Sequence, residues 1–141
     1  VSFAVVRNPW ARFVSYVAFM MRHNGLFTSD PQAAMRRVLA NPQNQSPVHF
    51  RAQADFVTDE GGAVMVSHLL RAESLQSDFD ALCEALSLPR VALEMRNASE
   101  HRDYREYYDQ DLVQRVAERY RADIDLFGYR FDGESNTGTA G

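Results

Sequence analysis

The chain has 141 residues, and 45% of them are hydrophobic, which is enough for one domain with its own core and too few for two. A net charge of -4 argues against a broadly basic surface of the kind that covers DNA, so we expect no nucleic-acid partner. We assign residues 1–131 to the domain and residues 132–141, which lack large apolar side chains, to a disordered tail.

The first predicted element is a strand from Phe3 to Val6, whose unbroken apolar run is typical of a strand buried on both faces of a parallel sheet. A helix follows at once, because Asn8 is a good N-cap and Pro9 suits the first helical position. We expect this helix to end near Gly25 and its apolar face to pack on the sheet. That face consists of Trp10, Phe13, Val14, Val17 and Met21.

The middle of the chain predicts a helix, a loop and a second strand. Asp30 and Pro31 mark the start of a short helix that ends near Asn41. The polar residues 41–63 then form a loop long enough to act as a lid or a binding loop. The segment VMVSHLL predicts the second strand, and its apolar positions include Val64, Val66 and Leu69.

Two more helices and a short strand complete the prediction. The first helix carries Leu75, Phe79, Leu82 and Leu86 on one face and ends before Pro89. The last helix runs from about Asp111 to Phe127 and stops at Gly128, and residues 129–131 alternate like a closing strand. The alternation of strand-like and helix-like segments favours an α/β fold over a helical bundle.

Arg7 is the first candidate functional residue, because it stands where a strand ends and a helix begins. Open α/β proteins bind ligands at this edge of the sheet, and a helix N-terminus adds unpaired N–H groups that favour an anion. Ser15 lies nearly two helical turns beyond Asn8 and therefore on the same side of the helix. The alternative is that Arg7 pairs with an acidic neighbour and Ser15 bonds back to its own helix.

The segment VVRNPWARFVSYV resembles the 3′-phosphate-binding segment of sulfotransferases that use 3′-phosphoadenosine 5′-phosphosulfate (PAPS). The similarity is to the Golgi-type carbohydrate sulfotransferase superfamily and its bacterial members, and two later blocks extend it over residues 1–131. These blocks begin at FVTDEGG and at NASEHRDY. The resemblance implies a P-loop-NTPase-like core, with a partial parallel sheet flanked by helices, in which Arg7 and Ser15 bind the 3′-phosphate.

The family's other cofactor loop, which holds the 5′-phosphosulfate, would lie upstream of Arg7 together with the catalytic base. No Gly-rich segment with the pattern K-[ST] occurs in the sequence. We therefore assign no catalytic residue and expect this chain to supply the 3′-phosphate side of the nucleotide site. Whether the chain is itself an enzyme stays open at this stage.

The segment NASEHRDYREYY interleaves aromatic and cationic groups, and the resemblance suggests that it closes over the nucleotide, with Tyr104 and Arg105 in contact. The alternative is that its tyrosines are packing residues and Arg105 is a paired or solvated charge. His49, in the long loop, is a candidate for contact with the acceptor, against an ordinary exposed histidine. We expect no metal site, because no pair of histidines has ligand spacing, and we expect the single Cys83 in the core.

The implied function is transfer of a sulfuryl group from PAPS to a hydroxyl of a carbohydrate or small metabolite, which releases 3′-phosphoadenosine 5′-phosphate (PAP). The alternative is a non-catalytic nucleotide- or partner-binding domain derived from a sulfotransferase. No apolar run has the length of a membrane span and no leader opens the sequence, so we expect a cytoplasmic protein without a membrane partner. An unpaired sheet edge beside Phe3 to Val6 would favour a homo-oligomer.

Overall fold

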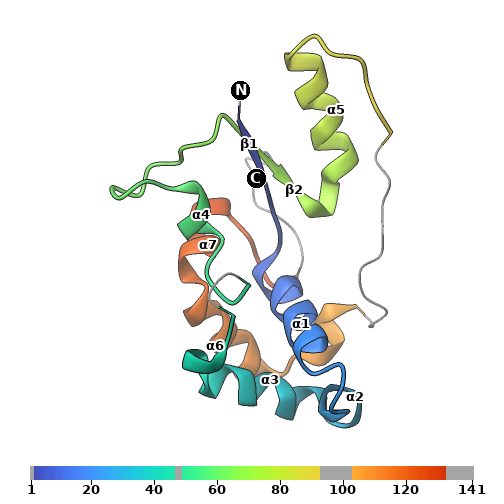
Figure 1. Ribbon diagram of the computed structural model, residues 1–141, viewed down its shortest axis with the longest axis vertical. Helices are drawn as coiled ribbons and strands as arrows, with labels where there is room; N and C mark the ends of the chain where they lie inside the picture. Colours follow the sequence, from blue (N-terminus) through green and yellow to red (C-terminus); the bar gives the residue numbers. More distant parts are fainter. Residues whose placement is uncertain (1, 47–48, 93–102, 133–141) are drawn as a thin grey trace.

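The computed structural model describes residues 2–46, 49–92 and 103–132, and it places a small parallel sheet above a group of packed helices (Figure 1). Strand β1 (Phe3–Val6) pairs with β2 (His68–Arg71), and Val6 lies opposite Arg71. Because the strands are parallel, both end at the same edge of the sheet, from which α1 (Pro9–Met20) departs. This architecture confirms the predicted α/β class.

Strand β1 is not buried on both faces, contrary to the prediction. Val6 is buried with 1% of its surface exposed, but Phe3 and Val5 are 50% and 47% exposed. Helix α5 (Leu75–Ala85) packs beside β2 and not over β1, so Leu70 is buried while its neighbour Val5 is not. The other edge of β1 has no strand partner among the described residues, and the predicted self-association stays a prediction.

Helix α1 begins as predicted. The side chain of Asn8 accepts hydrogen bonds from the backbone N–H groups of Trp10 and Ala11, and Pro9 fills the first position. The predicted stop was wrong, because α1 ends at Met20 and Gly25, with a φ of 76°, precedes α2 (Leu26–Ser29) instead.

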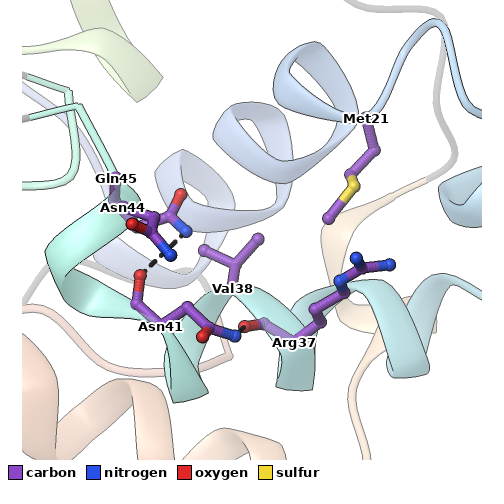
Figure 2. Close-up of a pocket in the computed structure, with 6 residues that line it drawn as sticks. All are labelled: Met21, Arg37, Val38, Asn41, Asn44 and Gln45. Atoms are coloured by element: carbon purple, nitrogen blue, oxygen red, sulfur yellow. Dashed lines mark hydrogen bonds between the residues drawn. The ribbon is translucent and has the colours of Figure 1, made fainter.

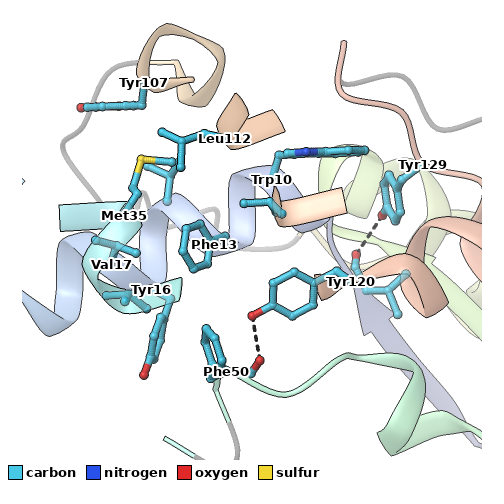
Figure 3. Close-up of a cluster of buried hydrophobic side chains, with 14 of the residues drawn as sticks. Trp10, Phe13, Tyr16, Val17, Met35, Phe50, Tyr107, Leu112, Tyr120 and Tyr129 are labelled. Atoms are coloured by element: carbon cyan, nitrogen blue, oxygen red, sulfur yellow. Dashed lines mark hydrogen bonds between the residues drawn. The ribbon is translucent and has the colours of Figure 1, made fainter. Parts of the chain in front are cut away.

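The apolar face of α1 is buried as predicted except at Met21, which lies just beyond the helix and is half-buried, and its main partners are helices and not the sheet. These partners are α3 (Pro31–Ala40), α6 (Gln110–Arg119) and the 3-10 turn η3 (Tyr104–Tyr107). Figure 3 shows the resulting core, in which Phe13 faces Phe50 and Tyr120 with ring centroids 6.4 Å from each. The sheet contributes Val6 to the same core.

The predicted loop 41–63 is partly helical and belongs to the core. It contains the 3-10 turn η1 (Pro42–Asn44) and the short helix α4 (Ala54–Val57). Phe50, Ala54 and Val57 are buried, each with 5% or less of its surface exposed. Because these apolar side chains anchor it, this part of the segment is a fixed wall of the domain and not a lid.

The second strand and the last helix differ from the prediction. The strand is displaced to His68–Arg71, because its pairing with β1 starts there, and Val64 forms only an isolated bridge with Thr58. The last helix breaks at Tyr120 into α6 and α7 (Arg121–Phe127), and Gly128 ends α7 in the left-handed conformation, as predicted. Residues 129–131 contain a single bridge residue, Tyr129, in place of a strand.

Two further predictions are confirmed by the structure. Helix α3 starts at Pro31, after an N-cap in which the side chain of Asp30 accepts the N–H of Ala33. Cys83 on α5 is buried, with 4% of its surface exposed. The predicted tail lies almost wholly outside the described residues, which end at residue 132.

The buried hydroxyl of Tyr120 predicts how stability changes at alkaline pH. This hydroxyl donates a hydrogen bond to the carbonyl of Phe50, and burial raises the pKa of Tyr120 from 10.0 to about 12. The unfolded chain loses this proton first, so the stabilising effect is complete below pH 10.0 and is lost as the pH rises to about 12. We expect Tyr120→Phe to flatten the fall of the unfolding free energy in this window by up to about 1.4 kcal/mol per pH unit.

Urea unfolding of both proteins between pH 9 and 12 measures this effect. The chain has no lysine, so tyrosines dominate the titration there. If the unfolding free energy falls with pH equally in the two proteins, Tyr120 ionises at the same pH in the folded and unfolded states, which would contradict the prediction.

Candidate functional site

The side chain of Gln53 forms hydrogen bonds with both the N–H and the carbonyl of Arg7, as a neighbouring strand would. Gln53 accepts a hydrogen bond from the N–H of Arg7 at 2.9 Å and donates one to its carbonyl at 2.7 Å. Gln53 is itself fixed by Asp123 of α7, a fully buried carboxylate that accepts the N–H groups of Gln53 and Ala54. The residue that follows β1 is therefore set firmly at the carboxyl edge of the sheet.

The side chain of Arg7 lies along helix α1 and contacts Ser15. Its Nη2 donates a hydrogen bond of 3.1 Å to Ser15 Oγ, and both residues are half-buried. The structure thus brings together the two residues that the resemblance assigned to one phosphate. Among the described residues no carboxylate lies within ion-pair distance of Arg7, which excludes there the alternative of pairing with an acidic neighbour.

The N-terminus of α1 does not offer the unpaired N–H groups that the sequence predicted. Asn8 Oδ1 accepts from Trp10 and Ala11, Pro9 has no N–H, and the N–H of Asn8 donates to Glu73 Oε2 at 2.7 Å. The first turn is already satisfied by these acceptors. An anion at this site would therefore meet the side chains beside the helix and not the end of the helix.

Glu73 is a residue of this edge that the sequence analysis did not single out. It lies in the 3-10 turn η2 (Ala72–Ser74) that follows β2, and its Oε1 accepts a hydrogen bond of 2.8 Å from the hydroxyl of Tyr129. The guanidinium of Arg71 lies over the Tyr129 ring, 5.2 Å from its centroid, and its buried Nη1 has no hydrogen-bond partner in the part of the chain that the structure describes. The signal available in the sequence was that Glu73 follows β2 closely, as Arg7 follows β1.

Arg12 adds a second positive charge near Arg7. Its Nη1 donates to the carbonyl of Arg51 at 2.7 Å, and its guanidinium lies 5.9 Å from the centroid of the Tyr120 ring. Burial lowers the pKa of Arg12, and the nearby charge of Arg7 acts in the same direction. Two half-buried guanidiniums therefore raise the positive potential beside α1.

Tyr104 and Arg105 lie in η3, which packs on α1, but no hydrogen bond or ion pair among the described residues joins them to Arg7 or Ser15. Tyr104 donates to the carbonyl of Phe131 at 2.6 Å, and Arg105 forms a two-pronged ion pair with Asp103 that lowers the carboxyl pKa to about 2. Both arrangements fit the alternative of a packing aromatic and a paired charge. Contact with a nucleotide stays a prediction for both, and residues 93–102 of the same segment lie outside the described residues.

His49 belongs to a local turn. Its N–H donates to Ser46 Oγ at 3.1 Å, and its Nδ1 lies 3.0 Å from the same oxygen. The residue is exposed, which fits an ordinary loop histidine, and its contact with an acceptor stays a prediction.

A cavity of about 260 Å³ lies between the end of α1 and the end of α3 (Figure 2). None of the predicted site residues lines it. The lining residues are Met21, Arg37, Val38, Asn41, Asn44 and Gln45.

Over the three described ranges, no helix combines the length and the apolar character needed to cross a membrane. In the same ranges, no three His, Cys, Asp or Glu side chains gather closely enough to hold a metal ion. Comparison with curated proteins and with solved structures gives no match. A sequence model described as the sulfotransferase family matches residues 1–130.

Proposed function

The chain belongs to the sulfotransferase family, and on this premise we propose that it serves the transfer of a sulfuryl group from PAPS to a hydroxyl acceptor. Arg7 and Ser15 bind the 3′-phosphate of the nucleotide in this proposal. The observation that carries it is the hydrogen bond between Arg7 Nη2 and Ser15 Oγ at the carboxyl edge of a parallel sheet. The mixed helix and sheet architecture is compatible with the core of this family.

The donors at this site suit a phosphate group. A guanidinium carries several N–H donors in a planar fork, and Arg7 uses only Nη2, on Ser15, among the described residues. Its backbone is fixed by Gln53, so the backbone of residue 7 loses little conformational entropy when an anion binds. Arg12 strengthens the positive potential near Arg7, while its own guanidinium donates to the carbonyl of Arg51 and not to Ser15.

PAPS supplies the sulfuryl group: the acceptor hydroxyl gives its proton to a base, its oxygen bonds to sulfur, and the bond from sulfur to the nucleotide oxygen breaks, which releases PAP. Arg7 and Ser15 contribute binding and alignment in this scheme, since the 3′-phosphate is not the group that reacts. The buried tyrosines are poor candidates for a base. Burial raises the pKa values of Tyr104 and Tyr120 to about 12, and each hydroxyl donates a hydrogen bond to a backbone carbonyl.

The acceptor in this proposal is a carbohydrate or small metabolite with a free hydroxyl, and His49 is the residue proposed to meet it. The exposed position of His49 supports access for a large acceptor. The proposal also includes a homo-oligomer formed through β1, whose exposed Phe3 and Val5 would be covered in such an assembly.

Transfer of the labelled sulfuryl group from PAPS by the intact protein tests this function. We expect label on a hydroxylated acceptor, with release of PAP. In Arg7→Ala the transfer rate at low PAPS concentration should fall about a hundredfold. Arg37→Ala, which removes an exposed charge beside the cavity of Figure 2, is the matched control and should keep the rate. Nucleotide binding without any transfer would favour the non-catalytic binding domain instead.

A further inference from the structure

We propose that Glu73 is a positioning residue of the phosphate site: it holds the turn between Arg7 and helix α1, and it keeps the bound phosphate beside this helix instead of at its end. The inference rests on the proposed function, since it concerns the same phosphate. It adds a residue that contacts neither Arg7 nor Ser15 in the described structure.

Both carboxylate oxygens of Glu73 accept hydrogen bonds from other segments of the chain. One carboxylate oxygen accepts the N–H of Asn8 at 2.7 Å, and the other accepts the hydroxyl of Tyr129 at 2.8 Å. Tyr129 is buried, with 2% of its surface exposed, and its hydroxyl lies 3.3 Å from the carbonyl of Val6. Glu73 thus connects the end of β2, the turn after β1 and the segment after α7.

The consequence for Arg7 follows from chain geometry. Residue 8 is held by Glu73 and residue 7 by Gln53, so both backbone positions at the start of the turn are fixed from outside the strand. A side chain on a fixed backbone can reach only a few places, and Ser15 marks the one that Arg7 adopts. Loss of the Asn8 contact would release the turn on one side.

The negative charge of Glu73 also acts on a bound phosphate. The N-terminal end of a helix attracts anions, and at the N-terminus of α1 the carboxylate of Glu73 already occupies this place. Among the described residues no arginine or histidine lies within ion-pair distance of Glu73, so its charge is not cancelled by a salt bridge. A phosphate is therefore repelled from the helix end and attracted to the side of α1, where Arg7 and Arg12 lie.

Two substitutions separate the two roles, because both remove the same charge. Glu73→Gln keeps an acceptor for the N–H of Asn8, and its amide can donate to the hydroxyl of Tyr129. We expect it to bind PAP about twofold to fivefold more tightly than the wild type at low salt, with the gain lost in high salt. Glu73→Ala removes both hydrogen bonds and should bind PAP about tenfold more weakly than Glu73→Gln.

The matched control is Asp78→Asn on α5. Asp78 accepts the N–H of Arg71 at the end of β2, so this variant makes the same change of charge and keeps an acceptor without touching Asn8. We expect its affinity for PAP to stay within about twofold of the wild type. Amide hydrogen exchange without nucleotide gives an independent readout, since Asn8 should exchange faster in Glu73→Ala and not in Glu73→Gln.

Equal affinities for the two Glu73 variants, with unchanged exchange at Asn8, would overturn the positioning role. Weaker binding by Glu73→Gln than by the wild type would overturn the electrostatic role. If Glu73→Ala does not fold, Tyr129→Phe removes one of the two hydrogen bonds and should also weaken PAP binding. Failure of the proposed function itself looks different: the wild type would then bind PAP no better than AMP, while faster exchange at Asn8 could still be observed.

Discussion

We expect Trp10→Ala to lower the free energy of unfolding by about 3 to 5 kcal/mol, the usual cost of truncating a buried aromatic side chain. Trp10 is 4% exposed, and its Nε1 donates to the carbonyl of Val113 on α6 at 3.0 Å. Its ring meets Phe131 edge-on, with centroids 5.7 Å apart. The residue therefore joins α1 to α6 and to the segment after α7, and its loss leaves a cavity where three segments meet.

Ser15→Ala is the matched comparison on the same helix. Ser15 is half-buried, and its hydroxyl oxygen accepts a hydrogen bond from the side chain of Arg7. Removal of this hydroxyl should leave the unfolding free energy almost unchanged. It should instead cost about 1 to 3 kcal/mol of PAP affinity, the range for one hydrogen bond to a neutral or charged partner. Urea unfolding with and without PAP measures both quantities. If Ser15→Ala unfolds the domain while Trp10→Ala only loses ligand, the two faces of α1 have been assigned in reverse.

The second large effect is expected at Arg7. Arg7→Lys should weaken PAP binding about tenfold or more, because an ammonium group cannot present two parallel N–H donors to a phosphate. Stability should change little, because the hydrogen bonds with Gln53 use only the backbone of residue 7 and remain available to lysine. Ligand-dependent shifts of the melting temperature report the loss of affinity.

Arg37→Lys is the control for Arg7→Lys, since Arg37 is exposed and lies at the separate cavity. It should bind PAP as the wild type does. Equal ligand shifts in Arg7→Lys and the wild type would remove Arg7 from the site.

The elements that the sequence predicted well are those specified by neighbouring residues. The start of α1 depends on Asn8 and Pro9, and the start of α3 depends on Asp30 and Pro31, so each signal lies within a few positions of its effect. The contact between Arg7 and Ser15 is similarly local, because helical spacing places the serine on the side of α1 that the arginine can reach.

The elements that were predicted wrongly depend on distant residues. The register of β2 is set by pairing with β1, so the apolar residues Val64 and Val66 gave a misleading start. The break at Tyr120 turns Asp123 toward the N–H groups of Gln53 and Ala54, about seventy positions earlier in the chain. Periodicity within the last helix carries no information about that contact.

The same reasoning explains which site residues escaped prediction. Asn8 and Glu73 are separated by 65 positions, and the place of Glu73 just after β2 does not by itself show that it contacts residue 8. Gln53 likewise supports Arg7 from 46 positions away. Local pattern could therefore identify Arg7 and Ser15 as candidate phosphate-binding residues, while the residues that hold Arg7 and its turn in place were found only in the fold.

The central claim is that Arg7 and Ser15 form a site for the 3′-phosphate of a nucleotide, and calorimetric titration with PAP and with AMP tests it most directly. The two ligands differ in that phosphate alone. We expect the chain to bind PAP at least about tenfold more tightly than AMP, since a charge-assisted hydrogen bond to phosphate contributes about 1.5 to 3 kcal/mol. Equal dissociation constants for PAP and AMP would contradict it.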